Sequence, residues 1–566
     1  MPTPGFSFGG EITVTADYYG YKSDPDSSQP GRRPAQLYRI LFDPIINFSE
    51  NFAIPFNIHL TTPETNTTTP SVPHPTLAQY FENPANAFGF SSITPRLGWA
   101  NLFLGSHSPV YSPLSVGDQQ IFGGGFDLKP GKFQFAASYG VSQRAIEPDT
   151  SRNIQGAFRR DMAMARVAFG DPNGSQFGIN VVHAHDDPTS ISNTIASIIP
   201  AHAAPEDTSI HIPADTVRLR AEEGYVASTD VKLKLGDAFT FAAEAAASIF
   251  TRDQSAAEKP ISGNPFGSLV TTRTSTRADF AGSASIGWQK TAWGIKLTGL
   301  YMGAGFEPIG YSFVQPDKLE VSVQPMLKLF DGGFTLDGSV GERRNNLSGT
   351  LGASTTQFIG DANLHATFSD AFDIGGHYSN FGVRNDLAND TLKVQNVSQS
   401  FGLDPMLTLR SDAMTHTLSG SAGFDEYDDF NTISGAASSN KMRTAILSYL
   451  LSLNSSPLTL GVTGSYVENI LATGPLIIRS AQARIGYSFF RNGLRAGFSA
   501  TVASSSSVLD PTDDQLFLKL DLRIRATSTI DFTASFENNE YQYGNPLPKG
   551  KSFREMLARL GATAKF

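Results

Sequence analysis

The chain has 566 residues, no cysteine, only 17% charged residues and a formal net charge of −10. The absence of cysteine excludes disulfides, cysteine-ligated zinc and thiol catalysis. The negative charge, with no basic stripe interleaved with aromatics, argues against nucleic acid as a partner. No stretch approaches the ~18 consecutive apolar residues of a membrane-spanning helix.

The N-terminal region predicts three strands, about Gly5–Tyr21, Gln36–Asn47 and Asn51–Thr61. The chain begins Met1-Pro-Thr-Pro, without the basic and apolar regions of a signal peptide. An exported protein needs such a signal, so we expect the numbering to start at or near the mature end.

Residues 62–116 do not fit the strand pattern found elsewhere. A Pro/Thr-rich run, Thr61–Pro70, opens this segment, and Ser92–Gly105 follows it. We interpret 62–116 as an insertion folded into the lumen, as a constriction or partial plug. In the alternative, Arg96–Gly105 is an ordinary wall strand with an unrecognised partner. The side chains that we place at the constriction are Arg96, Trp99, Asn101 and Phe103.

From Gly117 onward, the sequence predicts paired strands joined by tight turns. Gly, Pro, Asn, Asp and Ser recur in short clusters that tolerate positive φ or preset a bend, as hairpin turns require. The spacing leaves room for two strands and one longer loop per period, which favours an up-and-down meander. The predicted turns are Lys129–Lys132, Asp171–Gly174, Gly236–Asp237, Asp331–Gly333, Ser369–Ala371, Ser411–Ala413, Asn454–Pro457 and Arg491–Gly493.

The strands alternate apolar and polar residues over ten or more positions. Leu319–Leu329 and Leu516–Ala526 each have an aliphatic face opposite a charged face, and Val217–Leu235 is interpreted as one strand of the same kind. Strands of soluble sandwiches usually have about five or six residues, whereas a tilted strand needs about nine to eleven to cross a bilayer. A mean hydropathy of −0.17 agrees with such alternation.

The polar faces of these strands are predicted to line the lumen, where charged side chains set ion preference through their local field. The same residues could instead form cross-strand ion pairs that only stiffen the wall. The predicted lumen-lining residues are Arg218, Arg220, Lys232, Lys234, Lys318, Glu320, Lys328, Arg343, Lys519, Asp521, Arg523 and Arg525.

The last eleven residues, Met556–Phe566, alternate almost without error, with Leu560, Ala564 and the terminal Phe566 on the apolar face. An amphipathic strand that ends on a C-terminal Phe resembles the closing strand of bacterial outer-membrane β-barrels. The resemblance implies that the barrel-assembly machinery reads this terminal strand. It also implies a location in the Gram-negative outer membrane, with outer-membrane lipids and lipopolysaccharide as partners.

Together these patterns predict an all-β fold: one transmembrane antiparallel up-and-down β-barrel over residues 1–566, with short periplasmic turns and long extracellular loops. The count is about 24 strands if 62–116 is an insertion and 26 if Arg96–Gly105 joins the wall. Pro95–Gly105 and Lys129–Gly140 are also similar to large uncharacterised outer-membrane proteins of Bacteroidota type, which implies fold and compartment only.

No catalytic motif or cofactor motif emerges, so we expect no enzyme and no cofactor. The best metal-like cluster is His183, His185 and Asp186, because two His at i and i+2 share a strand face. A hydrated strand end is the simpler interpretation of these residues, and we expect no metal.

Three functions follow from a barrel of this kind. The first is a porin-like channel for passive transport of small solutes through a polar lumen, because a wall this wide cannot be filled by side chains alone. The second is a sealed structural barrel that scaffolds a surface or secretion complex, with a periplasmic or surface lipoprotein among its partners. A transporter of hydrophobic substrates is disfavoured, since the inward apolar residues are scattered.

Overall fold

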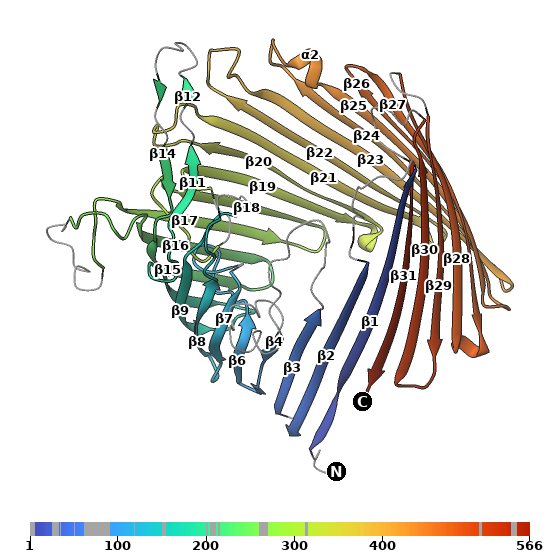
Figure 1. Cartoon of the computed structure of the whole chain (residues 1–566), viewed down its shortest axis with the longest axis horizontal. Coiled ribbons are helices and arrows are strands. Elements are labelled where there is room, and N and C mark those ends of the chain that lie inside the picture. The colour runs from blue at the N-terminus through green and yellow to red at the C-terminus, as the bar shows by residue number, and fades with distance from the viewer. Residues whose placement is uncertain are drawn as a thin grey trace.

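The computed structural model describes residues 6–24, 33, 35–49, 51–61, 91–117, 119–149, 154–199, 202–203, 211–212, 215–259, 270–311, 315–508, 512–544 and 552–566. These residues form one antiparallel sheet that closes on itself as a barrel (Figure 1). No helix among them is long and apolar enough to cross a membrane.

The wall has 26 strands when β4 and β5 are taken as one interrupted strand. In chain order they are β1 (Ser7–Asp24), β2 (Gln36–Ser49), β3 (Phe52–Thr61), β4 (Ser91–Ile93) with β5 (Arg96–Leu97), β6 (Ala100–His107), β7 (Ile121–Leu128), β8 (Phe133–Gln143), β9 (Arg159–Gly170), β10 (Gln176–Asp187), β15 (Glu223–Leu235), β16 (Phe239–Thr251), β17 (Thr276–Gln289), β18 (Trp293–Met302), β19 (Lys318–Leu329), β20 (Phe334–Asn345), β21 (Thr355–Ser369), β22 (Phe372–Asn385), β23 (Gln395–Arg410), β24 (Met414–Asp429), β25 (Asn440–Leu453), β26 (Leu458–Leu471), β27 (Gly474–Phe489), β28 (Leu494–Ser507), β29 (Asp513–Arg525), β30 (Ile530–Gln542) and β31 (Ser552–Lys565).

The barrel closes where the first strand meets the last. β1 and β31 pair without interruption from Glu11–Lys565 to Asp24–Ser552. At the end of this seam, Gly10 N donates to Phe566 O at 2.9 Å and Phe566 N donates to Gly10 O at 3.1 Å. The start of β1 and the end of the chain therefore lie at the same end of the barrel (Figure 1).

The 24-strand count is wrong, because the stretch around Arg96–Gly105 belongs to the wall. β4 and β5 pair with β3 on one side and with β6 on the other, and β6 pairs with β7. Pro95 lacks the N–H that a ladder needs and splits this strand into pieces of three and two residues. Such short pieces carry no alternation to detect in the sequence. The first part of the expected insertion, 62–90, lies outside the described residues.

The wall alternates as expected between an outward apolar face and an inward polar face. On β25 and β26, Leu447 is 60% exposed and Val462 is 58% exposed on the outside. Their neighbours Ser448 and Thr463 face each other across the ladder and share a hydrogen bond on the inside. The exposed apolar face is the surface that hydrocarbon covers in a membrane barrel.

The connections differ between the two ends of the barrel. At the end that holds the termini they are tight, and two of them are 3-10 turns, η2 (Phe330–Gly332) and η3 (Phe490–Asn492). At the other end they include the short helix α2 (Gly435–Ser438) and two small hairpins beyond the wall (Figure 1). These hairpins pair β11 (Ile195–Ile199) with β14 (Asp215–Arg218), and β12 (His202–Ala203) with β13 (His211–Ile212).

The stretch predicted as a single strand, Val217–Leu235, is divided in the structure. Its first residues belong to β14, residues 219–222 have no regular structure, and the wall strand β15 begins at Glu223. The sequence alternates across the break, so the pattern alone does not reveal it. Arg218 and Arg220 are therefore outside the wall.

Candidate lumen and inward segment

Residues 108–117, between β6 and β7, fold against the inner wall; we call them the inward segment. Val116 is fully buried, at 0% exposure, and Leu114 is nearly so. Both belong to an apolar cluster with inward side chains of β9, β10, β15, β16 and β18. Those wall residues include Met162, Met164, Val182, Val226, Ala246 and Met302. The inward segment thus covers one sector of the inner wall.

A buried carboxylate holds the inward segment in place. Glu244, at the middle of β16, is 6% exposed. Its Oε1 accepts a hydrogen bond from Ser112 Oγ at 2.6 Å, and its Oε2 accepts one from Leu114 N at 3.0 Å. Both carboxylate oxygens therefore accept a hydrogen bond from the inward segment. These hydrogen bonds offset the free energy that burying the carboxylate costs.

The polar contacts continue across three neighbouring strands. Asn180, on β10, donates to Ser112 Oγ at 3.2 Å and to Asp230 Oδ1 at 2.9 Å. Arg166, on β9, donates to both oxygens of Asp230, at 2.6 and 3.0 Å. A connected network of this kind fixes one position of the segment, because any displacement leaves buried polar groups unpaired.

Residues 303–311, after β18, pack over the inward segment. Val116 and Gly310 form a parallel bridge, and the Tyr311 hydroxyl donates to Ser112 O at 2.9 Å. A Cβ added at Gly310 would lie 1.9 Å from Ser115 O, so this close approach requires glycine. The two loops are thereby held as one body inside the wall.

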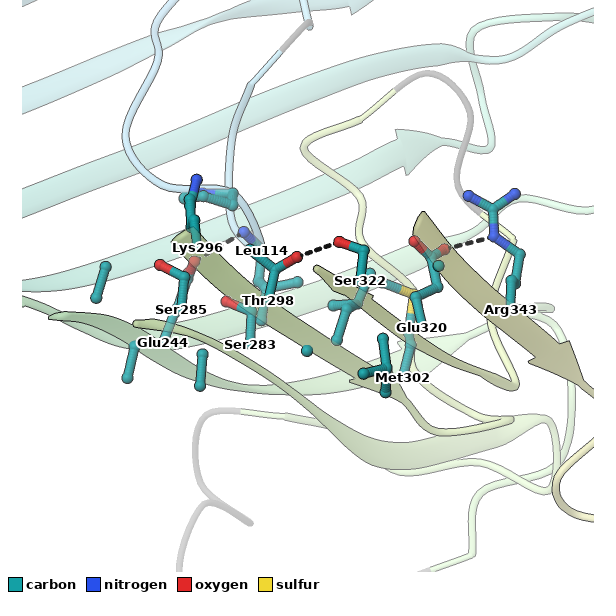
Figure 2. Close-up of a pocket in the computed structure, with 18 of the residues that line it drawn as sticks. Leu114, Glu244, Ser283, Ser285, Lys296, Thr298, Met302, Glu320, Ser322 and Arg343 are labelled. Carbon is teal, nitrogen blue, oxygen red and sulfur yellow. Dashed lines mark hydrogen bonds and ion pairs between the residues drawn. The ribbon is translucent and has the colours of Figure 1, made fainter. Parts of the chain in front are cut away.

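A cavity of about 700 Å³ adjoins the inward segment on the inner face of β15–β21. Figure 2 shows Leu114 beside Glu244, and a row of polar side chains leading away from them along the wall. In that row Arg343 Nε lies 2.7 Å and Lys318 Nζ lies 2.8 Å from Glu320 Oε1. Thr298 and Ser322 lie between this ion-pair group and the inward segment, and Lys296 lies on the other side of Leu114 (Figure 2).

Most of the predicted lumen-lining residues lie on the inner face. Lys232 and Lys234 are on β15, Lys318, Glu320 and Lys328 are on β19, and Arg343 is on β20. Lys519, Asp521, Arg523 and Arg525 are on β29. Several form ion pairs: Lys519 Nζ lies 3.4 Å from Glu537 Oε1, and Arg523 Nη2 lies 2.8 Å from Asp531 Oδ2. Arg220, in contrast, is a loop residue 3.6 Å from Asp253, and Arg218 is on the hairpin strand β14.

The residues expected at a constriction are parts of the wall hairpin. Arg96 is on β5, opposite Asn101 on β6, and Trp99 is in the turn between these strands. Phe103 stacks on His107 with ring centroids 5.2 Å apart. The segment that does fold inward is 108–117, at the end of the predicted insertion.

Four side chains that hold the inward segment were not found from the sequence: Ser112, Arg166, Asn180 and Glu244. One signal was present. Glu244 is the single charged residue of the Ala-rich strand Phe239–Thr251, where a charge needs a partner. The identity of that partner depends on pairing between strands distant in the sequence.

The metal-like cluster differs from the one expected. Asp186 points to the inner face, 3% exposed, and pairs with Arg160 at 2.6 Å. His183 and His185 point outward, and the carboxylate that joins them is Glu223, on the neighbouring strand β15. Neighbouring residues of a strand face opposite sides, so Asp186 cannot join His185.

A closed antiparallel wall with an apolar exterior and a charged interior defines a class of protein. The described residues have the fold of a transmembrane β-barrel, the architecture that occurs in bacterial outer membranes.

Comparison with known proteins finds similarity to solved structures at low sequence identity. No protein-family model and no curated protein matches the chain. Similar solved structures include Acinetobacter baumannii OccAB4, with 12% identity, a TM-score of 0.30, and coverage of 70% of this chain and 100% of that one. Pseudomonas aeruginosa OccK1 (OpdK) has 10% identity and a TM-score of 0.30, over 62% and 94% of the chains. The P pilus usher (PapC) translocation pore has 9% identity and a TM-score of 0.28, over 99% of each. Similarity at this level carries no argument about function, and the fold rests on the strand pairing itself.

Proposed function

We propose that the chain is an outer-membrane channel for passive passage of small polar solutes. The observation that carries this proposal is that the described residues fill the 26-strand wall only in part. The inward segment covers the inner face of β9–β18, while inner side chains elsewhere stay accessible to water. His377 and Asp404, on β22 and β23, have side chains 52% and 48% exposed. A lumen with half-exposed polar and acidic side chains favours a water-filled path.

The charges of the described lumen are mixed in sign. Basic side chains such as Lys318 and Arg343 lie beside Glu320, and Lys519 lies beside Asp521 and Glu537. Such pairs give local fields of both signs along the path. We therefore propose broad conduction of small hydrophilic solutes, with the inward segment as the element that limits size.

Planar-bilayer recording and liposome swelling test this proposal. The purified wild type is expected to give discrete conductance steps and to admit small sugars. A variant in which a short Gly-Ser linker replaces residues 109–116 is expected to give larger steps and a higher size limit. Absence of conductance in both proteins would contradict the proposal. Equal conductance in the two would remove the size-limiting role of the inward segment.

A second function, a scaffold for a surface complex, is favoured by the hairpins β11–β14 and β12–β13, which extend beyond the wall. Its partner would be a lipoprotein or another surface component, held at the long-loop end. Two results together would favour this function over a channel. A partner subunit would co-purify with the barrel, and the purified barrel would show no ion conductance. Lipopolysaccharide and outer-membrane lipids, around the apolar exterior, are partners that we propose under either function, as is the barrel-assembly machinery.

A further inference from the structure

Three potential metal ligands meet on the outside of the barrel, near the long-loop end of β10 and β15. His183 and His185 are two residues apart on β10 and share its outward face. In the β10–β15 ladder His185 is directly opposite Glu223, and His183 is opposite Tyr225. This register gives the two imidazoles a carboxylate from the adjacent strand, so the three groups form a triangle rather than a row.

The donor atoms are close to a coordinating arrangement. His183 Nε2 lies 3.1 Å and His185 Nδ1 lies 3.7 Å from Glu223 Oε1. One donor atom from each residue lies within 4.8 Å of the other two. Ligands at about 2.0–2.1 Å in a tetrahedral zinc site lie roughly 3.3 Å apart, so small side-chain rotations would bring these atoms onto one ion.

Neighbouring groups orient these ligands. The His183 ring stacks on Tyr225 with centroids 4.2 Å apart. The Tyr225 hydroxyl donates to Glu223 Oε1 at 3.0 Å. Asp161, opposite His185 on β9, is held by Arg159 at 2.8 Å and is not part of the triangle. Outer contacts of this kind fix ligand orientation in metal sites.

We propose that His183, His185 and Glu223 bind one divalent transition-metal ion, with Zn²⁺ the best match. Two imidazole nitrogens and one carboxylate oxygen suit Zn²⁺, Ni²⁺ or Cu²⁺, whereas Mg²⁺ and Ca²⁺ prefer all-oxygen ligand sets. Three protein ligands leave a coordination position open to water or to an anionic oxygen from outside. The site is on the outer face and does not depend on whether the lumen conducts.

Zinc titration of the full chain tests the proposal. The protein is refolded into detergent without a histidine tag and without lipopolysaccharide, stripped with chelator, and titrated calorimetrically with ZnCl₂ and separately with MgCl₂. Co²⁺ absorption then reports the ligand geometry. The wild type is expected to bind one Zn²⁺, to ignore Mg²⁺ at the same concentrations, and to give the intense visible bands of four-coordinate Co²⁺.

The variants separate this site from other histidine–carboxylate pairs. His183→Asn, His185→Asn and Glu223→Gln are each expected to lose the Co²⁺ bands and to weaken Zn²⁺ binding at least tenfold. Tyr225→Phe, which removes only an orienting hydroxyl, is expected to weaken binding by about tenfold. The matched control is His377→Asn. Its histidine lies 3.9 Å from Asp404 in a pair without a second histidine, and its loss should leave binding unchanged.

The same data can overturn the proposal. It is wrong if the folded wild type, judged by far-UV circular dichroism, shows no saturable Zn²⁺ binding. It is equally wrong if the three ligand variants bind as the wild type does, or if Mg²⁺ displaces Zn²⁺ at comparable concentration.

Discussion

Arg559 and Asp17 are 542 residues apart in the chain and adjacent at the seam of the barrel. Arg559 donates to Asp17 at 2.7 and 3.1 Å, and Arg39 reaches the same carboxylate from the other side at 3.3 Å. The pair joins the last strand to the first, on the inner face. It therefore contributes to closure of the barrel, and a lumen exists only if the barrel is closed.

Arg559→Ala is expected to lower the free energy of unfolding by about 1–3 kcal/mol, because it leaves a buried carboxylate with one weaker partner. Urea unfolding in detergent, followed by tryptophan fluorescence, measures the change. Lys565→Ala is the control, since its ammonium lies 3.7 Å from the exposed Glu11 at the same seam and should contribute little. Equal effects of the two substitutions would contradict the role given to Arg559.

Glu244→Ala is expected to release the inward segment. The substitution leaves Ser112 Oγ and Leu114 N without their buried acceptor, at a cost of about 2 kcal/mol or more. Because the chain has no cysteine, Ser115→Cys introduces a single thiol at a fully buried position. This thiol should be unreactive to a water-soluble maleimide in the otherwise native protein and reactive when Glu244→Ala is added. Slow labelling of the thiol both with and without Glu244→Ala would show that other contacts hold the inward segment in place.

Gly310→Ala tests the packing of the second loop on the inward segment. The new methyl group cannot fit at 1.9 Å from Ser115 O, so the two loops must separate. We expect faster labelling of the same Ser115→Cys thiol. Gly464→Ala is the matched control, because an added Cβ there meets nothing within 4 Å. Unchanged labelling in Gly310→Ala would mean that the close approach is not maintained in solution.

Phe566→Ala is expected to slow assembly more than it destabilises the finished barrel. The terminal ring stacks on Phe8 at 5.0 Å between centroids, a contact of modest energy. Folding yield in the presence and absence of the reconstituted assembly machinery separates the two effects. Phe536→Ala removes an outward aromatic from β30 without touching the terminus, and should leave the assisted yield unchanged. A similar loss in both variants would argue against recognition of the terminal residue.

The Glu147 carboxylate gives one pH-dependent contact between loops. It accepts hydrogen bonds from Ser192 N at 2.6 Å and Asn193 N at 3.2 Å. These backbone donors lower the pKa of Glu147 below its ordinary value of 4.5. A depressed folded-state pKa means that the contact is complete above the ordinary value and is lost as pH falls through the lowered one.

Hydrogen exchange measures that contact directly. Protection factors of the Ser192 and Asn193 amides should be constant near neutral pH and fall in acid, below the ordinary pKa of a glutamate. In Glu147→Gln the protection should be lower and independent of pH. Protection that persists in acid in the wild type would show that other contacts hold these loops.

Much of the wall could be predicted from the sequence, because alternation is a local property. Leu319–Leu329 is a wall strand, and the apolar and polar faces of Met556–Phe566 point outward and inward as the pattern indicated. The pattern failed where the local signal was broken or ambiguous. Pro95 divides one wall strand into β4 and β5, which are too short to show alternation. The alternation that continues after Val217 gives no sign that β14 ends at Arg218 and that the wall strand begins only at Glu223.

The inward segment and the histidine cluster could not be derived in the same way, because both depend on register between strands. Glu244 meets Ser112 only after β6, β16 and the strands between them are aligned. Likewise, Glu223 rather than the adjacent Asp186 joins His185, since the ladder places Glu223 directly opposite on the same face. Sequence spacing within one strand contains no information about such partners.

The central claim is a closed wall with lipid outside and water inside, and cysteine accessibility across one strand pair tests it most directly. Single cysteines are placed at the outward positions Leu447 and Val462 and at the inward positions Ser448 and Thr463, in proteoliposomes. A charged, water-soluble thiol reagent is then applied to each variant. The structure predicts rapid labelling of both inward positions and none of the outward ones. Labelling of Leu447→Cys and Val462→Cys at the rate of their inward neighbours would contradict it.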